Sequence, residues 1–186
     1  MHPWHGFFRS VLVAVLLTVW GAGAAAAQEF MADTMSRMGQ TSEYLRLYVK
    51  DGNMRMQRLG GVGYTIVRRD RGVVWVVYPE RGVYLELPLD PASLPLGTTR
   101  LAGEISRRPA GVSIVANRPC RMYEVTTQVQ GRQQKVRACL SEELKTALSV
   151  EAEDGSFASR VTKVYEGRVP ARLLEVPAGY KKITRE

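Results

Sequence analysis

Short runs in which apolar and polar residues alternate, separated by turn residues, constrain the fold of this chain most strongly. Residues 44–50 show the pattern clearly. Leu45, Leu47 and Val49 fall on one face of such a run, because successive side chains of a β-strand point to opposite sides. Asp51-Gly52-Asn53 then predicts a tight turn. Strand and turn signals recur along the chain, which predicts a mainly β (α+β) protein built around an antiparallel sheet.

The remaining segments divide into further strands, one helix and several connections. Residues 88–111 are rich in Pro and Gly and predict a long connection, as a lid or rim loop. Ser141 is placed to cap a short helix over residues 141–150. Residues 170–183 form a tail with apolar anchors. We expect strands over residues 54–59, 62–69, 73–78, 83–87, 111–117, 120–127, 132–140 and 159–169.

The opening segment, residues 30–38, fits two structures. Met31, Met35 and Met38 have the spacing of one helix face. As a strand, the same segment would place Phe30, Ala32, Thr34 and Met38 on a common face.

The amino-terminal 27 residues have the three parts of a secretory signal peptide. Arg9 supplies a positive charge, residues 11–20 are apolar, and residues 21–27 are small. The sequence Ala25-Ala26-Ala27 fits a cleavage site before Gln28. A membrane anchor needs about 20 apolar residues, roughly twice the run present here. We therefore expect residues 1–27 to be removed, leaving residues 28–186 as a single domain that does not span a membrane and lies in the periplasm.

Charge favours an anionic partner only weakly. The chain has 26 Lys and Arg and 18 Asp and Glu, and removal of Arg9 with the signal peptide leaves a net charge of +7. Such a charge attracts anionic surfaces, but it also serves plain solubility. The basic residues are scattered along the chain as short pairs, and export makes nucleic acid a poor partner.

Catalytic chemistry finds little support in the residue types. Both histidines, His2 and His5, lie in the predicted signal peptide. The exported domain thus lacks the usual general base and the usual zinc ligands. Glu142 and Glu143 do not share a helix face, so they do not form a catalytic carboxylate pair. We expect no catalytic residue, no metal site and no cofactor.

Cys120 and Cys139 are expected to form a structural disulfide, because an even pair of cysteines in an exported chain is typical of one. A redox pair is the alternative, but redox cysteines are usually close in sequence, as in the motif Cys-x-x-Cys. We place the two cysteines directly opposite each other in a hairpin with residues 128–131 as its loop. That register sets Glu124 against Lys135 and Tyr123 against Val136.

A second hairpin spans residues 73–87 around Pro79-Glu80-Arg81-Gly82. A four-residue loop pairs Val77 with Tyr84, and this pair fixes the register of the other residues in the two strands. The face that carries Val74, Val76, Leu85 and Leu87 is wholly apolar and is expected to point inward. The opposite face, with Trp75, Tyr84 and Glu86, is mixed and is expected to be partly wet.

Several segments together resemble a family of exported bacterial domains of unknown function, over about residues 29–183. These segments are residues 30–33, 47–56, 72–80, 83–86 and 174–180. That family is similar in architecture to the outer-membrane lipoprotein carrier superfamily. The resemblance implies a strongly curved antiparallel sheet or half barrel with an apolar concave face covered by a helix or loop. It also implies a strand at residues 30–38, and relatives that carry or sense lipids and acylated proteins.

These observations favour a non-enzymatic periplasmic binding or carrier domain for a lipid, an acylated protein or another amphiphile. An envelope protein interaction or sensor module without a small ligand is the alternative hypothesis. Met54, Met56 and Met122 could supply adaptable lining for a groove, and the aromatic residues Trp75, Tyr78 and Tyr84 either line it or pack as ordinary core. The candidate ligand-binding residues are Leu45, Leu47, Val74, Val76, Leu85 and Leu87.

Overall fold

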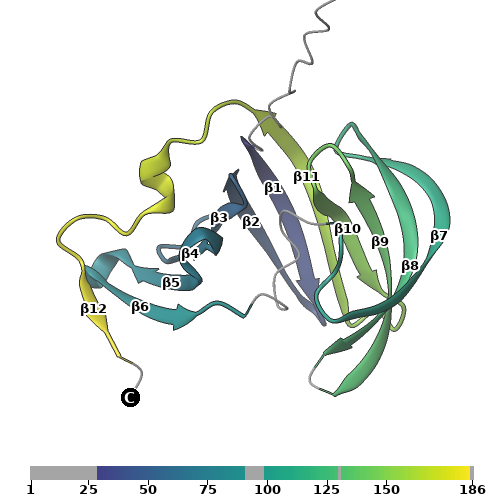
Figure 1. The fold of residues 1–186 in the computed structure, drawn as a ribbon, viewed down its shortest axis with the longest axis horizontal. Coiled ribbons are helices and arrows are strands. Elements are labelled where there is room, and N and C mark those ends of the chain that lie inside the picture. Colours follow the sequence, from purple (N-terminus) through teal and green to yellow (C-terminus); the bar gives the residue numbers. More distant parts are fainter. Residues whose placement is uncertain (1–28, 91–98, 130, 185–186) are drawn as a thin grey trace, which may run out of the picture.

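One open twelve-stranded sheet makes up the fold in the computed structural model (Figure 1). The structure describes residues 29–90, 99–129 and 131–184, so the predicted signal peptide lies outside the described residues. The strands are β1 (Glu29–Met38), β2 (Thr41–Lys50), β3 (Asn53–Arg58), β4 (Tyr64–Arg68), β5 (Val73–Tyr78), β6 (Val83–Pro88), β7 (Glu104–Val115), β8 (Arg118–Val129), β9 (Arg132–Ser141), β10 (Thr146–Ala152), β11 (Phe157–Glu166) and β12 (Lys181–Ile183).

The order of the strands is β12-β6-β5-β4-β3-β2-β1-β11-β10-β9-β8-β7. Neighbours pair antiparallel, apart from β12 and β6, which run parallel. Figure 1 shows the sheet curling so that β7–β9 and β4–β6 lie on opposite sides of the central strands β1 and β11. A bulge between Asp33 and Thr34 interrupts the pairing of β1 with β11, and bulges add bend to a sheet. The predicted mainly β, curved antiparallel fold is confirmed.

Residues 30–38 belong to a strand. Phe30, Ala32 and Thr34 are buried on one face of β1, whereas the residues between them are half-buried. This period of two is the burial pattern of a strand and not of a helix. The strand reading, which the family resemblance favours, is therefore confirmed.

The predicted helix over residues 141–150 is wrong. Ser141 does act as a local cap, since its Oγ accepts a hydrogen bond from the Leu144 N–H at 3.2 Å. Lys145 then adopts a left-handed conformation, with φ of 44°, which stops the turn from continuing as a helix. The chain enters β10 at Thr146 instead. Helical structure in the described residues is limited to short 3-10 turns, including Ala171–Leu174.

The predicted connection over residues 88–111 is too long. Strand β7 begins at Glu104, seven residues before the expected start at Gly111, and residues 91–98 lie outside the described residues. The pattern of β7 is hard to detect because this strand is an edge and most of its side chains are exposed. Pro109 is tolerated there because an edge strand can spare one N–H donor.

The two predicted hairpins differ in outcome. Val77 faces Tyr84 and Val74 faces Leu87, so the register of the β5–β6 hairpin is confirmed. In the β8–β9 hairpin, Met122 and not Cys120 lies opposite Cys139, a shift of two residues. Val129 pairs with Arg132, so the loop has two residues where four were expected, and Gly131 accepts a φ of 79° there.

The disulfide between Cys120 and Cys139 is present, with Cα atoms 5.4 Å apart. The bond links residues that are offset along the two strands. A disulfide therefore identifies strands that lie side by side, but it does not require its two cysteines to be directly opposite.

The two faces of the β2–β6 region differ in what packs against them. We call the face that carries Leu47, Met54 and Val74 the inner face; part of the main core lies there. On the opposite, outer face, Trp75 and Val77 are 7% and 0% exposed. Outer-face residues pack against Val176 and Tyr180 of the carboxy-terminal segment. The expectation of a partly wet outer face holds for Tyr84 and Glu86, which are half-buried, whereas Trp75 is covered by that segment.

An ion-pair cluster fastens the carboxy-terminal segment to the outer face. Arg68, only 8% exposed, binds Asp70 and Glu175 and donates a hydrogen bond to the Leu174 carbonyl oxygen at 3.2 Å. The guanidinium beside it lowers the pKa of the Asp70 carboxyl. A buried arginine needs this full set of partners to offset the loss of its hydration.

Candidate functional site

An open apolar groove of about 460 Å³ lies on the inner face, where the two sides of the curved sheet meet. One wall comes from β1–β3 and the other from β8–β11, with residues 101–102 at the rim. Pockets of about 300–1,000 Å³ are the size that holds a small ligand. The apolar lining includes Leu47, Met54, Met56, Leu101, Val136 and Leu148.

The polar groups of the groove are uncharged. Among the described residues that line it, none is Asp, Glu, Lys or Arg. The polar lining consists of Thr34, Thr127, Gln134, Thr146, Ser149 and Ser159. Burying a charge without a partner is costly, so this lining suits a hydrocarbon chain and uncharged polar atoms and disfavours a charged headgroup.

The rim of the groove is held by a close backbone contact. The Gln128 N–H donates a hydrogen bond to the Gly103 carbonyl oxygen at 2.8 Å. Glu104, whose side chain is 4% exposed, binds Arg107 and accepts a hydrogen bond from the Leu101 N–H at 3.0 Å. Arg107 also donates to the Thr99 carbonyl oxygen at 2.8 Å. These contacts fix Leu101 and Ala102 against the groove.

Replacement of Gly103 by Ala should lower the free energy of unfolding by about 2 kcal/mol, from left-handed strain and overpacking together. Gly103 has a φ of 64°, and a Cβ there would lie 2.2 Å from the Gln128 carbonyl oxygen. Urea unfolding measures the change. Gly39→Ala is the matched control, because Gly39 has a φ of 58° and an added Cβ would meet nothing within 4 Å. Equal losses for the two variants would contradict the close contact.

The predicted ligand-binding residues are only partly gathered in this groove. Leu47 lines it, as do Met54 and Met56. The other five predicted residues are half-buried on the inner face but are not part of the groove lining: Leu45, Val74, Val76, Leu85 and Leu87. Met122 packs against the main core cluster.

The far wall of the groove was missed by the sequence reasoning. Val136, Leu148 and Val161 come from strands that are more than eighty residues away from Leu47 in the chain. Because residues 141–150 were predicted as a helix, strand β10 was not recognised. This strand supplies five lining residues. The sequence signal that could have predicted this wall is the run from Thr146 to Val150, interpreted as a strand.

The hairpin aromatics belong to the outer face. Trp75 and Tyr84 form an edge-to-face pair with ring centroids 6.3 Å apart, and the Trp75 indole N–H donates to Glu86 at 2.9 Å. They pack beneath the carboxy-terminal segment, so the reading as ordinary packing is confirmed for these two residues.

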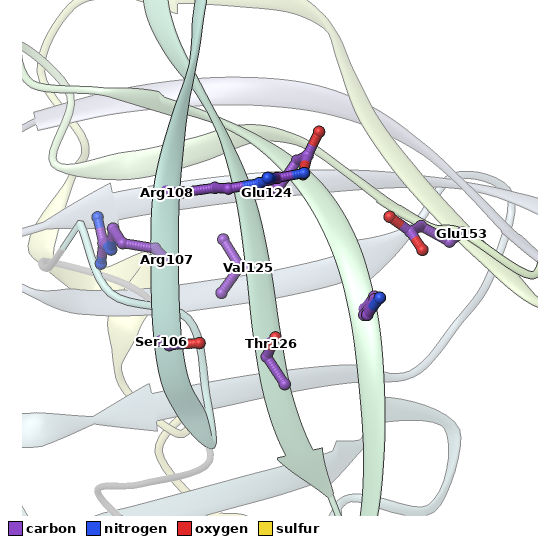
Figure 2. A pocket seen from close by; sticks show the side chains of 8 residues that line it. Ser106, Arg107, Arg108, Glu124, Val125, Thr126 and Glu153 are labelled. Carbon is purple, nitrogen blue, oxygen red and sulfur yellow. The ribbon is translucent and has the colours of Figure 1, made fainter.

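A second, polar pocket of about 320 Å³ lies over β7–β9 (Figure 2). Three of its charged groups already have partners: Figure 2 shows Arg108 reaching across to Glu124, and Arg107 binds Glu104. In the part of the chain that the structure describes, no cluster of three or more His, Cys, Asp or Glu residues could hold a metal ion. The apolar groove is therefore the better candidate site.

Comparisons with known proteins support the fold. No protein-family model matches the chain, and no curated protein matches its sequence. A chain of the MucA/MucB complex of Pseudomonas aeruginosa matches with a TM-score of 0.55 and 19% identity, over 81% of this chain and 56% of that chain. PNGF-II matches with a TM-score of 0.54 and 9% identity, over 86% of this chain and 31% of that chain.

A domain described as an outer-membrane lipoprotein-sorting protein from Vibrio parahaemolyticus reaches a TM-score of only 0.28, at 9% identity over 78% of this chain and 88% of that domain. That score is too low to support a shared fold. MucB matches with a TM-score of 0.54 and 20% identity, which shows a shared fold alone. The chain spans a little more than half the length of the first matched chain.

The fold and the groove together describe an open, curved sheet that carries an apolar groove on its inner face.

Proposed function

We propose that this chain is a non-enzymatic periplasmic carrier that holds the apolar part of a lipid, an acylated protein or another amphiphile. The observation that carries the proposal is the groove itself: about 460 Å³, largely apolar, uncharged in its described lining and open to solvent. An amphiphile can place its hydrocarbon there and keep its headgroup in water. Burial of apolar surface provides the binding free energy.

Location in the periplasm follows from the predicted signal peptide, residues 1–27, and fits the likeness to MucB. The disulfide adds support, since such bonds persist in oxidising compartments. In the described part of the chain, no helix is long and apolar enough to cross a membrane.

A second candidate function is docking on another envelope protein. Two observations favour it. One matched chain comes from a complex between two proteins, MucA and MucB. In addition, edge strand β7 exposes Val112 and Ile114, which are 83% and 70% exposed. An unpaired edge can accept a strand from a partner.

Mass spectrometry separates the two candidates. We expect protein purified from periplasm without detergent to carry lipid or acyl species, seen in the native spectrum and released by solvent extraction. Such species would also identify the ligand class. A bare protein that also binds no added lipid, but retains an envelope protein in a pull-down, would contradict the carrier proposal and favour docking.

A further inference from the structure

Thr34 places a buried hydroxyl without a partner in the wall of the groove. The residue is 6% exposed and lines the apolar groove. Its Oγ1 has no hydrogen-bond partner. Buried polar groups in folded proteins are nearly always paired, so an unpaired hydroxyl calls for an explanation.

The surroundings of Thr34 explain why the protein itself does not satisfy this hydroxyl. Its strand neighbours on either side are Leu45 and Val161, both apolar. The nearest serines along the strands use each other, since the Ser36 hydroxyl donates to the Ser159 hydroxyl at 3.2 Å. A valine would fill almost the same volume without the cost of an unpaired hydroxyl.

The backbone at Thr34 is also irregular. The β1–β11 pairing shifts register between Asp33 and Thr34, so β11 contributes the extra residue Thr162 at this point. Bulges re-aim side chains and are common beside binding sites. The unpaired hydroxyl, the bulge and the groove therefore coincide at one position.

We infer that Thr34 recognises an uncharged polar atom of the ligand, the carbonyl oxygen of an acyl ester or amide. A threonine hydroxyl can donate one hydrogen bond, and a carbonyl oxygen is a good acceptor. The described lining offers no cation to hold a carboxylate, so a free fatty acid would have to leave its charged end outside. The inference rests on the proposed carrier function and specifies its ligand class as esterified or amidated acyl chains.

Thr127 provides a matched control in the same groove. It is 5% exposed, and its hydroxyl already donates to the Gln134 carbonyl oxygen at 3.3 Å. Thr34→Val and Thr127→Val thus remove the same chemical group from two lining positions. Only the first of these hydroxyls lacks a partner in the protein.

The test compares monolauroylglycerol with the dodecyl ether of glycerol, which has a similar chain but no carbonyl group. Both compete against the fluorescent probe N-phenylnaphthylamine. We expect the wild-type protein to bind the ester about fivefold to tenfold more tightly than the ether, the effect of one hydrogen bond. Thr34→Val should abolish this preference, and Thr127→Val should retain it.

Stability without ligand gives an independent readout. Thr34→Val should be at least as stable to urea as the wild-type protein, whereas Thr127→Val should be less stable, because it leaves the Gln134 carbonyl oxygen without that donor.

The possible results separate this inference from the carrier proposal. If both glycerol lipids bind but the ester preference is absent or survives in Thr34→Val, the role of Thr34 is wrong and the carrier function stands. If neither lipid binds to the wild-type protein, the carrier function and the role of Thr34 are both wrong.

Discussion

A Cys120→Ala, Cys139→Ala double variant is expected to lose about 3 kcal/mol of its free energy of unfolding. The disulfide closes a loop between residues 19 apart, and in the chain-entropy model a loop of this size contributes about that amount. Both cysteines lie in the main core cluster, at 5% and 0% exposed. Urea unfolding of the oxidised wild-type protein and of the variant measures the difference.

Reduction of the wild-type protein distinguishes the contribution of the disulfide bond to stability from that of the two side chains. The reduced protein keeps both sulfur atoms in the core, so it should lose most of the same 3 kcal/mol if loop closure is the cause. A reduced protein as stable as the oxidised one would show that the double variant is destabilised because its smaller alanine side chains leave space in the core.

Met56→Glu is expected to weaken binding of monolauroylglycerol by at least about tenfold, since an ionised carboxylate in an apolar groove must lose hydration without gaining a partner. Met56 is half-buried on the inner face and lines the groove. Displacement of N-phenylnaphthylamine by the lipid measures the change.

Met35→Glu is the matched control for this substitution. Met35 is also half-buried, but it lies on the outer face of β1, where it pairs with Arg160 of β11. The same new charge there should leave binding unchanged. Equal losses for the two variants would point to general destabilisation, and no loss for Met56→Glu would contradict the placement of the ligand in the groove.

The hairpins could be predicted because the residues that determine them lie close together in the sequence. The β5–β6 hairpin has a clear loop in Pro79–Arg81 and Gly82, and its residues pair as the pattern requires. The β8–β9 hairpin was placed correctly in the chain but two residues out of register. The register was wrong because it assumed that the two bonded cysteines lie directly opposite each other, which the geometry of a disulfide does not require.

Long-range contacts could not be predicted in the same way. The pairing of β1 with β11 brings Phe30 to Glu166, and no local pattern announces that contact. The groove depends on it, because its two walls belong to opposite sides of that pairing. The sequence therefore indicated one wall, through Leu47, Met54 and Met56, and left the other unseen.

The capping signal at Ser141 illustrates a further limit. Its side chain makes the contact of a helix start, yet the backbone turns at Lys145 and continues as a strand. A capping contact fixes only one turn of the chain, whereas a longer helix needs tertiary packing to be stable. Here the available support is strand β9, whose Leu140 pairs with Ala147 of β10.

The pairing of β1 with β11 also sets the order in which the molecule can assemble. Hairpins such as β5–β6 and β1–β2 can close as soon as their own residues are free, but the other edge of β1 pairs with β11, more than a hundred residues later. Closing so large a loop is slow, because its entropy is lost before the contacts form. A chain that ends at residue 156 therefore has most of its strands but lacks β11, the strand that joins the two walls of the groove, so we expect binding only after β11 has paired.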